Sequence, residues 1–224
     1  MSDQSPDPMP QRLLLLRHGQ VSSHRGDVPV TPDGLVFAET VGLRLAEQNE
    51  EMLVLSGETR RTCETAEAVA EGARRGGMKV DGPRISFGLR NPDLYVAGER
   101  VNMVSSAEAL AAQVEGLGED SAARVPFFTG FLPAKDRIGW WLSHPDPPGD
   151  NASSVAHRIA KFAQSLSDQP LTRLVVGVTH SPVLRACGLK MLGQDRGEPD
   201  WVAGLSIEIG PDRTIKADWF EHPA

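Results

Sequence analysis

The chain has 224 residues, of which 40% are hydrophobic, and a formal net charge of -7. This length predicts one domain with one sizeable core. The negative charge argues against binding to nucleic acid, which requires a basic surface. The first apolar run, Leu13 to Leu16, is too short for a signal peptide or a membrane span. We therefore expect a cytoplasmic protein that makes no contact with a membrane.

The first eleven residues differ in composition from the rest of the chain. They contain three prolines, two aspartates and no aliphatic side chain other than methionine. We expect residues 1–11 to form a disordered tail ahead of a single domain over residues 12–224. Cys63 and Cys187 lie far apart and in no metal-ligand pattern, so the sequence implies no disulfide framework, metal site or cofactor.

Three apolar runs have the pattern of strands that are buried on both faces of a parallel sheet. These runs are residues 13–16, residues 52–56, and residues 173–180, which end in His180. A weaker strand is expected at residues 79–85, and a closing hairpin at residues 205–210 and 214–220.

Helical patterns separate the expected strands. Thr31 is a typical N-cap, and Pro32 suits the first position of the helix that follows. Further helices are expected at residues 61–72, 151–166 and 181–192. Strands that alternate with helices predict an α/β fold, a three-layer α/β/α sandwich around a mostly parallel central sheet.

Residues 91–148 do not follow this alternation. They contain many loop-forming residues, a helical pattern at residues 106–115 and the aromatic pairs Phe127-Phe128 and Trp140-Trp141. We expect this segment to be an insertion, or cap, over the active site. Its aromatic side chains either pack a small core or line an apolar part of the substrate site.

Basic side chains follow three of the expected strands. Arg17 and His18 come directly after the first strand, and Arg60 and Arg61 come shortly after the second. His180 ends the third. Ligands of open α/β sheets bind beyond the carboxyl ends of the strands. Because guanidinium groups match phosphate oxygens and a neutral histidine can attack phosphorus, the sequence predicts an anion site that contains a nucleophile.

Four segments of the chain together resemble the histidine phosphatase superfamily, also called the phosphoglycerate mutase-like superfamily. These segments are LLLLRHGQ at residues 13–20, TPDG at 31–34, LSGETRRTCETAEAVA at 55–70 and VVGVTHSPVLRA at 175–186. The resemblance extends from about Leu13 to Leu192 and is weak in the middle.

The resemblance implies a role for each basic side chain of the expected site. His18 matches the histidine that accepts the phosphoryl group, and Arg17 matches the arginine that binds it. His180 matches the second histidine, which forms hydrogen bonds with the transferring oxygens. These groups would stabilise the charge on the phosphoryl group without a metal ion.

The second family arginine is selected by its spacing. In the family it stands four residues before a Thr-Ala pair. In this chain Thr65-Ala66 therefore selects Arg61 rather than Arg60 as a further phosphate-binding residue.

The sequence departs from the family at the general acid. Family members commonly carry a glutamate shortly after the third strand, where this chain has Asn91, whose amide cannot protonate a leaving alcohol. Asp93 is the nearest carboxylic acid and is the candidate general acid. Glu99, or no residue at all, is the alternative, and Asp93 would then only cap the turn around Pro92. Without an acid, phosphates with good leaving groups, such as aryl phosphates, are expected to react best.

These features predict a phosphatase that hydrolyses a phosphomonoester or another phosphorylated small molecule through a phosphohistidine. One alternative is a phosphotransferase similar to phosphoglycerate mutases. Another is an anion-binding or regulatory module of the same fold with little turnover. The substrate stays open because residues 91–148 would select it, and the oligomeric state stays open as well.

Overall fold

A six-stranded sheet forms the centre of the computed structural model, which describes residues 11–23, 26–168 and 174–222. Its strands, in spatial order, are β3 (Lys79–Ile85), β2 (Glu51–Ser56), β6 (Leu174–Thr179), β1 (Gln11–Arg17), β7 (Gly204–Ile209) and β8 (Ile215–Phe220). The first four are parallel to one another, β7 is antiparallel to its neighbour β1, and β8 is antiparallel to β7. The prediction of a mostly parallel sheet with a closing hairpin is confirmed.

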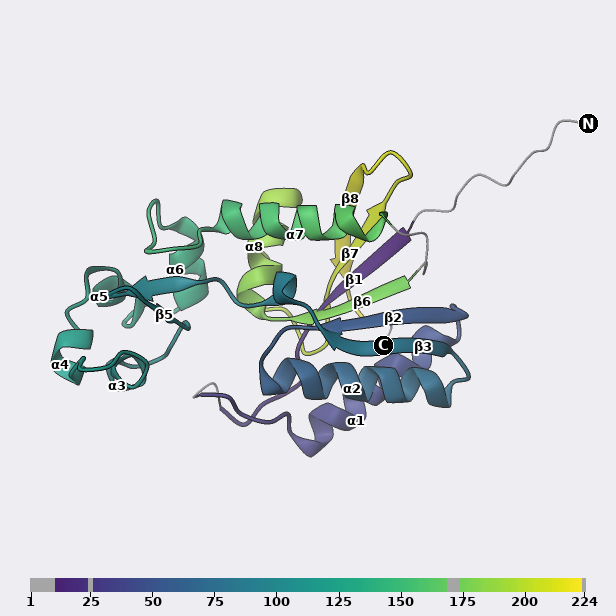
Figure 1. Cartoon of the computed structure of the whole chain (residues 1–224), viewed down its shortest axis with the longest axis horizontal. Coiled ribbons are helices and arrows are strands. Elements are labelled where there is room, and N and C mark those ends of the chain that lie inside the picture. Colours follow the sequence, from purple (N-terminus) through teal and green to yellow (C-terminus); the bar gives the residue numbers. More distant parts are fainter. Residues whose placement is uncertain (1–10, 24–25, 169–173, 223–224) are drawn as a thin grey trace, which may run out of the picture.

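Helices cover both faces of this sheet (Figure 1). On one face lie α1 (Pro32–Ala46) and α2 (Arg60–Arg75), and on the other lie α7 (Ala152–Leu166) and α8 (Ser181–Met191). The four leucines of β1 are fully buried and alternate between the two cores. Burial of a leucine side chain stabilises the fold by roughly 1.5–3 kcal/mol, so this strand is a main anchor of the three-layer sandwich.

Two glycines let α1 and α2 approach each other closely. A Cβ at Gly42 would lie 2.0 Å from the carbonyl oxygen of Val69, and a Cβ at Gly72 would lie 1.9 Å from that of Glu39. No side chain fits at either position, because real Cβ contacts of this kind are longer than 3 Å. The close contact fixes α2, which carries Arg61, against α1.

The ends of several elements differ from the sequence predictions. Gln11, which we expected in the tail, is the first residue of β1 and pairs with Ile209, while residues 1–10 lie outside the described residues. The helical pattern at residues 106–115 yields only α3 (Ala107–Ala111). The chain adopts a left-handed backbone at Gly116, with φ of 74°, and this turn separates α3 from the short helix α4 (Glu119–Ala122).

Residues 91–148, here called the cap, form a group of short elements at one end of the sheet (Figure 1). These elements are β4 (Leu94–Val96), β5 (Glu99–Val101), α3, α4, α5 (Pro126–Phe131) and α6 (Arg137–Ser143), and a 3-10 turn, η1 (Phe87–Leu89), precedes them. Phe127, Phe128, Phe131 and Trp141 are buried in the same core as α7 and α8. Core packing is therefore the main use of these aromatic side chains.

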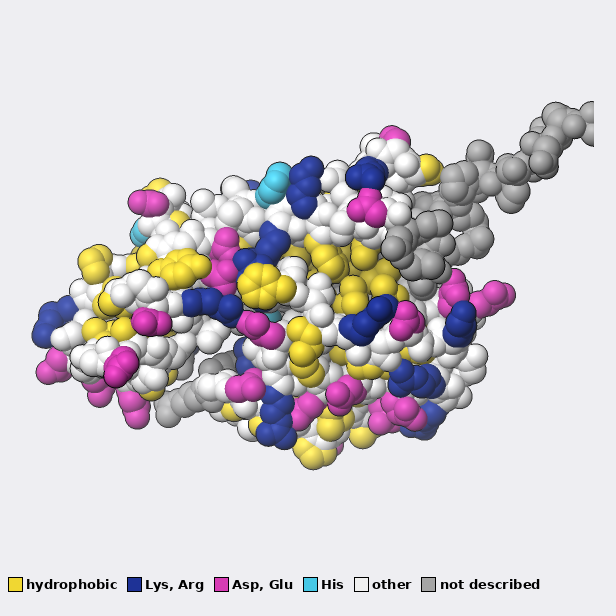
Figure 2. Space-filling view, in the orientation of Figure 1, with side chains coloured by type: hydrophobic (Ala, Val, Ile, Leu, Met, Phe, Trp, Pro, Cys, Tyr) yellow, Lys and Arg dark blue, Asp and Glu magenta, His cyan; other side chains and the backbone are white. Residues whose placement is uncertain are grey.

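Charged side chains of both signs are interspersed over the face of the molecule shown in Figure 2. Along α2 and β3, ion pairs such as Arg75 with Glu39 and Arg84 with Asp81 join them. The excess negative charge is thus spread over this face and does not form one acidic patch (Figure 2). Among the helices that the structure describes, none is both long and apolar enough to cross a membrane.

Candidate active site

The two histidines come together because β1 and β6 are parallel neighbours. Arg17 pairs with Thr179 at the last position of the two strands, so His18 and His180 follow side by side. The backbone N–H of His18 donates to the carbonyl oxygen of Thr179 at 3.0 Å. The centroids of the two imidazole rings are 5.5 Å apart, which confirms that the strand ends bring both rings to one place.

One ring nitrogen of His18 is oriented for attack. Its Nδ1 lies 2.8 Å from the carbonyl oxygen of Gly19, and because a carbonyl oxygen only accepts, Nδ1 carries the proton. The lone pair of the neutral ring is then on Nε2. The His18 side chain is also buried.

Thr65 connects the second arginine to the nucleophile. Its Oγ1 accepts a hydrogen bond from the backbone N–H of Gly19 at 2.8 Å and donates to the carbonyl oxygen of Arg61 at 2.6 Å. The Arg61 guanidinium in turn lies 3.4 Å from Nδ1 of His180. Arg60, by contrast, is exposed and forms an ion pair with Glu64 at 2.6 Å. The spacing of Arg61 to the Thr-Ala pair therefore has a direct structural reason.

Arg17 is buried against the loop that leads into β7. Its guanidinium carbon lies 3.7 Å from the ring centre of Trp201, and its Nη1 donates to the carbonyl oxygen of Pro199 at 2.5 Å. Nη2 forms an ion pair with Glu198 at 2.6 Å. Burial lowers the pKa of Arg17, while Glu198 and Asp200 raise it.

Arg17 and Arg61, the two candidate phosphate-binding arginines, each have one guanidinium nitrogen without a hydrogen-bond partner among the described residues. Burial lowers the pKa of Arg61 from its ordinary value of 12.5, and the charge of Asp27 opposes this shift. An arginine shifted in this way is still a cation at neutral pH. Within the part of the chain that the structure describes, the buried Nε atoms of Arg17 and Arg61 have no hydrogen-bond partner.

The contact between Arg17 and the loop follows from the sheet order. Because β7 is antiparallel to β1, the start of β7 lies beside the end of β1, and Gly204 pairs with Leu16. The sequence predicts the hairpin of β7 and β8, but not its place beside β1. Glu198 and Trp201 were missed for that reason, and only knowledge of the strand order would have revealed them.

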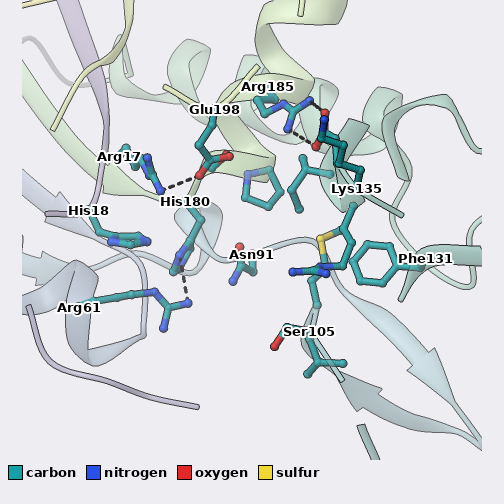
Figure 3. A pocket seen from close by; sticks show the side chains of 17 residues that line it. Arg17, His18, Arg61, Asn91, Ser105, Phe131, Lys135, His180, Arg185 and Glu198 are labelled. Atoms are coloured by element: carbon teal, nitrogen blue, oxygen red, sulfur yellow. Dashed lines mark hydrogen bonds and ion pairs between the residues drawn. The ribbon is translucent and has the colours of Figure 1, made fainter. Parts of the chain in front are cut away.

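These side chains line a cavity of about 400 Å³ at the carboxyl ends of β1 and β6 (Figure 3). Arg17, His18, Arg61 and His180 form one side of the cavity, which agrees with the sequence prediction. The other side comes from the cap and from α8. The further lining residues are Asn91, Met103, Val104, Ser105, Phe131, Lys135, Asp136, Arg137, Ile138, Ser181, Pro182, Arg185 and Glu198.

Arg185 joins the cap to the core. Its guanidinium is buried and binds both carboxylate oxygens of Asp136, at 2.8 and 2.6 Å, and both of Asp195, at 2.9 and 2.8 Å. These contacts raise the pKa of Arg185 above its ordinary value despite its burial and lower the pKa of Asp136 to about 2. Asp136 is also the N-cap of α6, through the N–H of Gly139. We call this cluster the Arg185 clamp.

The carboxylic acids considered from the sequence do not line the cavity. Asp93, the candidate general acid, is buried and forms ion pairs with Arg90 at 2.8 Å and Arg100 at 3.1 Å. Glu99 is exposed at the start of β5. Asn91 does line the cavity, so the position expected to hold a glutamate holds an amide. Asp93 therefore forms ion pairs with neighbouring arginines at the start of the cap, and the structure does not bring it to the phosphate site.

The cysteines lie away from this chemistry. Complete burial raises the pKa of the Cys187 thiol to about 12. Cys63, on α2, makes weak contacts with Ser56 at the end of β2 and with the carbonyl oxygen of Gly57. Over residues 11–23, 26–168 and 174–222, no group of three His, Cys, Asp or Glu side chains is arranged to hold a metal ion.

A family model agrees with the resemblance that the sequence predicted. The model of the histidine phosphatase superfamily, branch 1, matches residues 13–81, which include Arg17, His18 and Arg61. The segment around His180 lies outside the matched range. No curated protein matches the chain. The recognition of this superfamily from its motifs is thereby confirmed.

Solved structures of phosphatases and a mutase share the fold. A mycobacterial glucosyl-3-phosphoglycerate phosphatase superposes with a TM-score of 0.57 and 18% identity, covering 94% of this chain and 98% of its own. Phosphoglycerate mutase from Bacillus anthracis gives 0.59 and 15%, covering 95% and 93%. A phosphoserine phosphatase variant from Entamoeba histolytica gives 0.59 and 14%, covering 94% and 97%. At these identities the likeness establishes a phosphoglycerate mutase-like fold.

Proposed function

We propose that this protein is a phosphatase that hydrolyses a phosphorylated small molecule through a phosphohistidine on His18. The observation that carries the proposal is the convergence of His18, His180, Arg17 and Arg61 on one cavity. This is the set of groups that phosphoryl transfer to histidine requires: a neutral nucleophile and several donors for the equatorial oxygens.

The reaction proceeds in two steps. In the first, Nε2 of His18 attacks the phosphorus in line with the leaving oxygen, and the ring orientation held by Gly19 provides the lone pair. In the second, water attacks the phosphohistidine from the side that the leaving group has vacated, and inorganic phosphate is released. Arg17, Arg61 and His180 hold the phosphoryl oxygens in both steps and stabilise their charge.

Similar proteins support a substrate with a phosphoryl group on a small organic molecule. The similar structures include phosphatases named for glucosyl-3-phosphoglycerate and for phosphoserine, and a phosphoglycerate mutase. A cavity of about 400 Å³ suits a metabolite of that size. Incubation with a panel of phosphorylated metabolites, with phosphate release measured for each, would identify the substrate. A rephosphorylated isomer without phosphate release would instead indicate a mutase.

Capture of the phosphoenzyme tests the proposal. After brief exposure to an aryl phosphate and quenching in alkali, mass spectrometry should find one phosphoryl group on His18. His18→Ala should lose both the phosphoryl group and phosphate release. His157→Ala, which changes an exposed histidine on α7, should retain both. Unphosphorylated enzyme with full phosphate release would contradict the mechanism, and absence of any turnover would favour an anion-binding module.

A further inference from the structure

Glu198 brings a carboxylate into a cavity that is otherwise built to bind an anion. Its side chain lies beside the phosphate-binding groups, on the side that faces the open part of the cavity (Figure 3). One carboxylate oxygen, Oε1, is 2.6 Å from Nη2 of Arg17, and the other, Oε2, accepts a hydrogen bond from the hydroxyl of Ser181 at 2.5 Å. The side chain remains 48% exposed, so it is accessible to solvent and to a bound molecule.

The other carboxylates near the site are committed elsewhere. Among the described lining residues, only Asp136 and Glu198 carry a carboxyl group. Both oxygens of Asp136 are held by Arg185, and its pKa of about 2 keeps it ionised at neutral pH. Asp93 is held by Arg90 and Arg100 outside the cavity. Among the described lining residues, Glu198 is thus the carboxyl group that contacts one arginine and one hydroxyl instead of a guanidinium that holds both oxygens.

Arrival of a phosphate changes the charge balance at Glu198. The carboxylate and a phosphate dianion would share the guanidinium of Arg17, and two anions that close disfavour each other's charged form. Proton uptake by the carboxyl group relieves this repulsion. The monoanion of a phosphate ester can supply that proton, since the second pKa of phosphate esters is about 6.

The partner of Glu198 suits either protonation state. A serine hydroxyl can donate one hydrogen bond and accept two, so Ser181 can donate to the carboxylate and accept from the carboxylic acid. Arg17 also contacts Pro199 and Trp201, and neither contact involves the Glu198 carboxyl group. Proton exchange at Glu198 therefore requires no rearrangement of the loop that leads into β7.

We propose that Glu198 is the proton donor and acceptor of this site, a role that rests on the proposed phosphatase function. In the first step, the bond from His18 Nε2 to phosphorus forms, the bond to the leaving oxygen breaks, and the Glu198 acid protonates that oxygen to give the alcohol. In the second step, the Glu198 carboxylate takes a proton from water as the water oxygen attacks phosphorus. His18 leaves neutral, phosphate is released, and the carboxylic acid is regenerated.

This assignment alters the expectation for leaving groups. Asn91 alone would leave an alkyl phosphate without a proton donor, whereas Glu198 supplies one from a different element of the fold. An aryl phosphate, whose leaving group is stable as an anion, depends little on the acid. The dependence of the rate on the leaving group therefore reports on Glu198 directly, and a merely structural residue would affect both substrate types alike.

The test compares Glu198→Gln with Asp200→Asn. Asp200 lies on the same loop, and its charge also raises the pKa of Arg17. Its substitution therefore removes one negative charge near Arg17 without removing a residue that lines the cavity. In Glu198→Gln, kcat/KM for an alkyl phosphate should fall at least about 100-fold. For p-nitrophenyl phosphate, whose first step needs little help from an acid, kcat/KM should fall less than about tenfold. Asp200→Asn should change both by the same small factor.

Accumulation of the phosphoenzyme gives the second readout. Because Glu198→Gln lacks the base for the second step, p-nitrophenyl phosphate should give a burst of nitrophenol and a higher fraction of phosphorylated His18 than the unaltered protein. Equal losses on both substrates, with no burst, would overturn the assignment of Glu198 while leaving phosphohistidine catalysis intact. Absence of phosphohistidine from the unaltered protein would instead overturn the proposed function itself.

Discussion

The two sides of the cavity are built in different ways. On the sheet side, His18, Arg17 and His180 follow directly from strands whose neighbours and register fix their positions. On the cap side, Lys135 and Arg137 stand at the start of a short helix that is held to the core by the Arg185 clamp. The side chains on the sheet side can bind any phosphoryl group. The shape and charge of the cap side depend instead on the conformation of short helices and loops.

This difference separates chemistry from selectivity. A change on the sheet side should reduce the rate with every phosphorylated substrate, because all of them share the phosphoryl group. A change on the cap side should act on stability or on particular substrates. The predictions below test that division, and a cap variant that affected all substrates equally would contradict it.

The largest effect is expected from Arg61→Ala. The variant loses a cationic group that lines the cavity and contacts His180, so kcat/KM should fall about 10²–10³-fold on every substrate. Arg60→Ala is the matched control, because Arg60 is adjacent, exposed and paired only on the surface. Steady-state kinetics on two unrelated phosphates would measure both. A similar loss in both variants would mean that the spacing rule selected the wrong arginine.

Arg185→Ala should have the largest effect on stability. The substitution leaves the carboxylates of Asp136 and Asp195 without their cation, and removal of one partner of a buried ion pair costs about 3–5 kcal/mol. Because the Asp136 side chain is 57% exposed, the lower end of that range is expected. Urea unfolding would measure the loss, with Arg196→Ala, which removes a surface pair, as the control. KM should rise as α6 loses its anchor.

The same comparison explains how far the sequence could predict this protein. The strands, the layers and the grouping of His18, Arg61 and His180 follow from local patterns, because strand ends of a parallel sheet share one edge. Glu198 could not be found in this way, because its position depends on β7 lying beside β1, and a hairpin pattern does not specify which strand it joins. Asp93 was considered by its distance along the chain, yet Arg90 and Arg100 hold it outside the cavity.

Thr65→Val should have an intermediate effect on the sheet side. The substitution leaves the backbone N–H of Gly19 buried without its acceptor, which costs about 1–3 kcal/mol of stability. Because Gly19 orients the His18 ring, kcat should also fall on all substrates, up to about 100-fold if the nucleophile shifts. Thr65→Ser retains the hydroxyl and should restore most of both properties. Equal defects in the two variants would mean that the hydroxyl, which Thr65→Ser retains, is not what supports Gly19, and the hydrogen bond would then not explain the effect.

Acid should weaken the Arg185 clamp in a defined direction. The pKa of Asp136 is lowered from 3.8 to about 2, so its contribution to stability is present above about pH 4 and is lost as the pH falls toward 2. Asp136→Asn keeps an N-cap residue for α6 but has no charge to lose. The difference in unfolding free energy between the two proteins should therefore shrink between pH 5 and about pH 2.5. A constant difference over that range would show that the charge of Asp136 is not what stabilises the cap.

The smallest effect is expected from Lys135→Ala on the cap side. The Lys135 ammonium lines the cavity and is exposed, and no hydrogen bond or ion pair to it is found within the described residues, so it is available to a second anionic group of a substrate. Exposed ion pairs contribute about 0.2–1 kcal/mol, so KM for a carboxylated phosphate such as 3-phosphoglycerate should rise about two- to fivefold. KM for p-nitrophenyl phosphate, which has no second anionic group, should stay unchanged in Lys135→Ala. The control is Lys190→Ala, which alters an exposed lysine of α8 outside the cavity and should leave KM unchanged for both substrates. Added salt should reduce the difference between the two substrates, because screening weakens an exposed pair. An equal rise for both substrates would mean that Lys135 acts on the phosphoryl group itself, and the division between the two sides of the cavity would then fail at this residue.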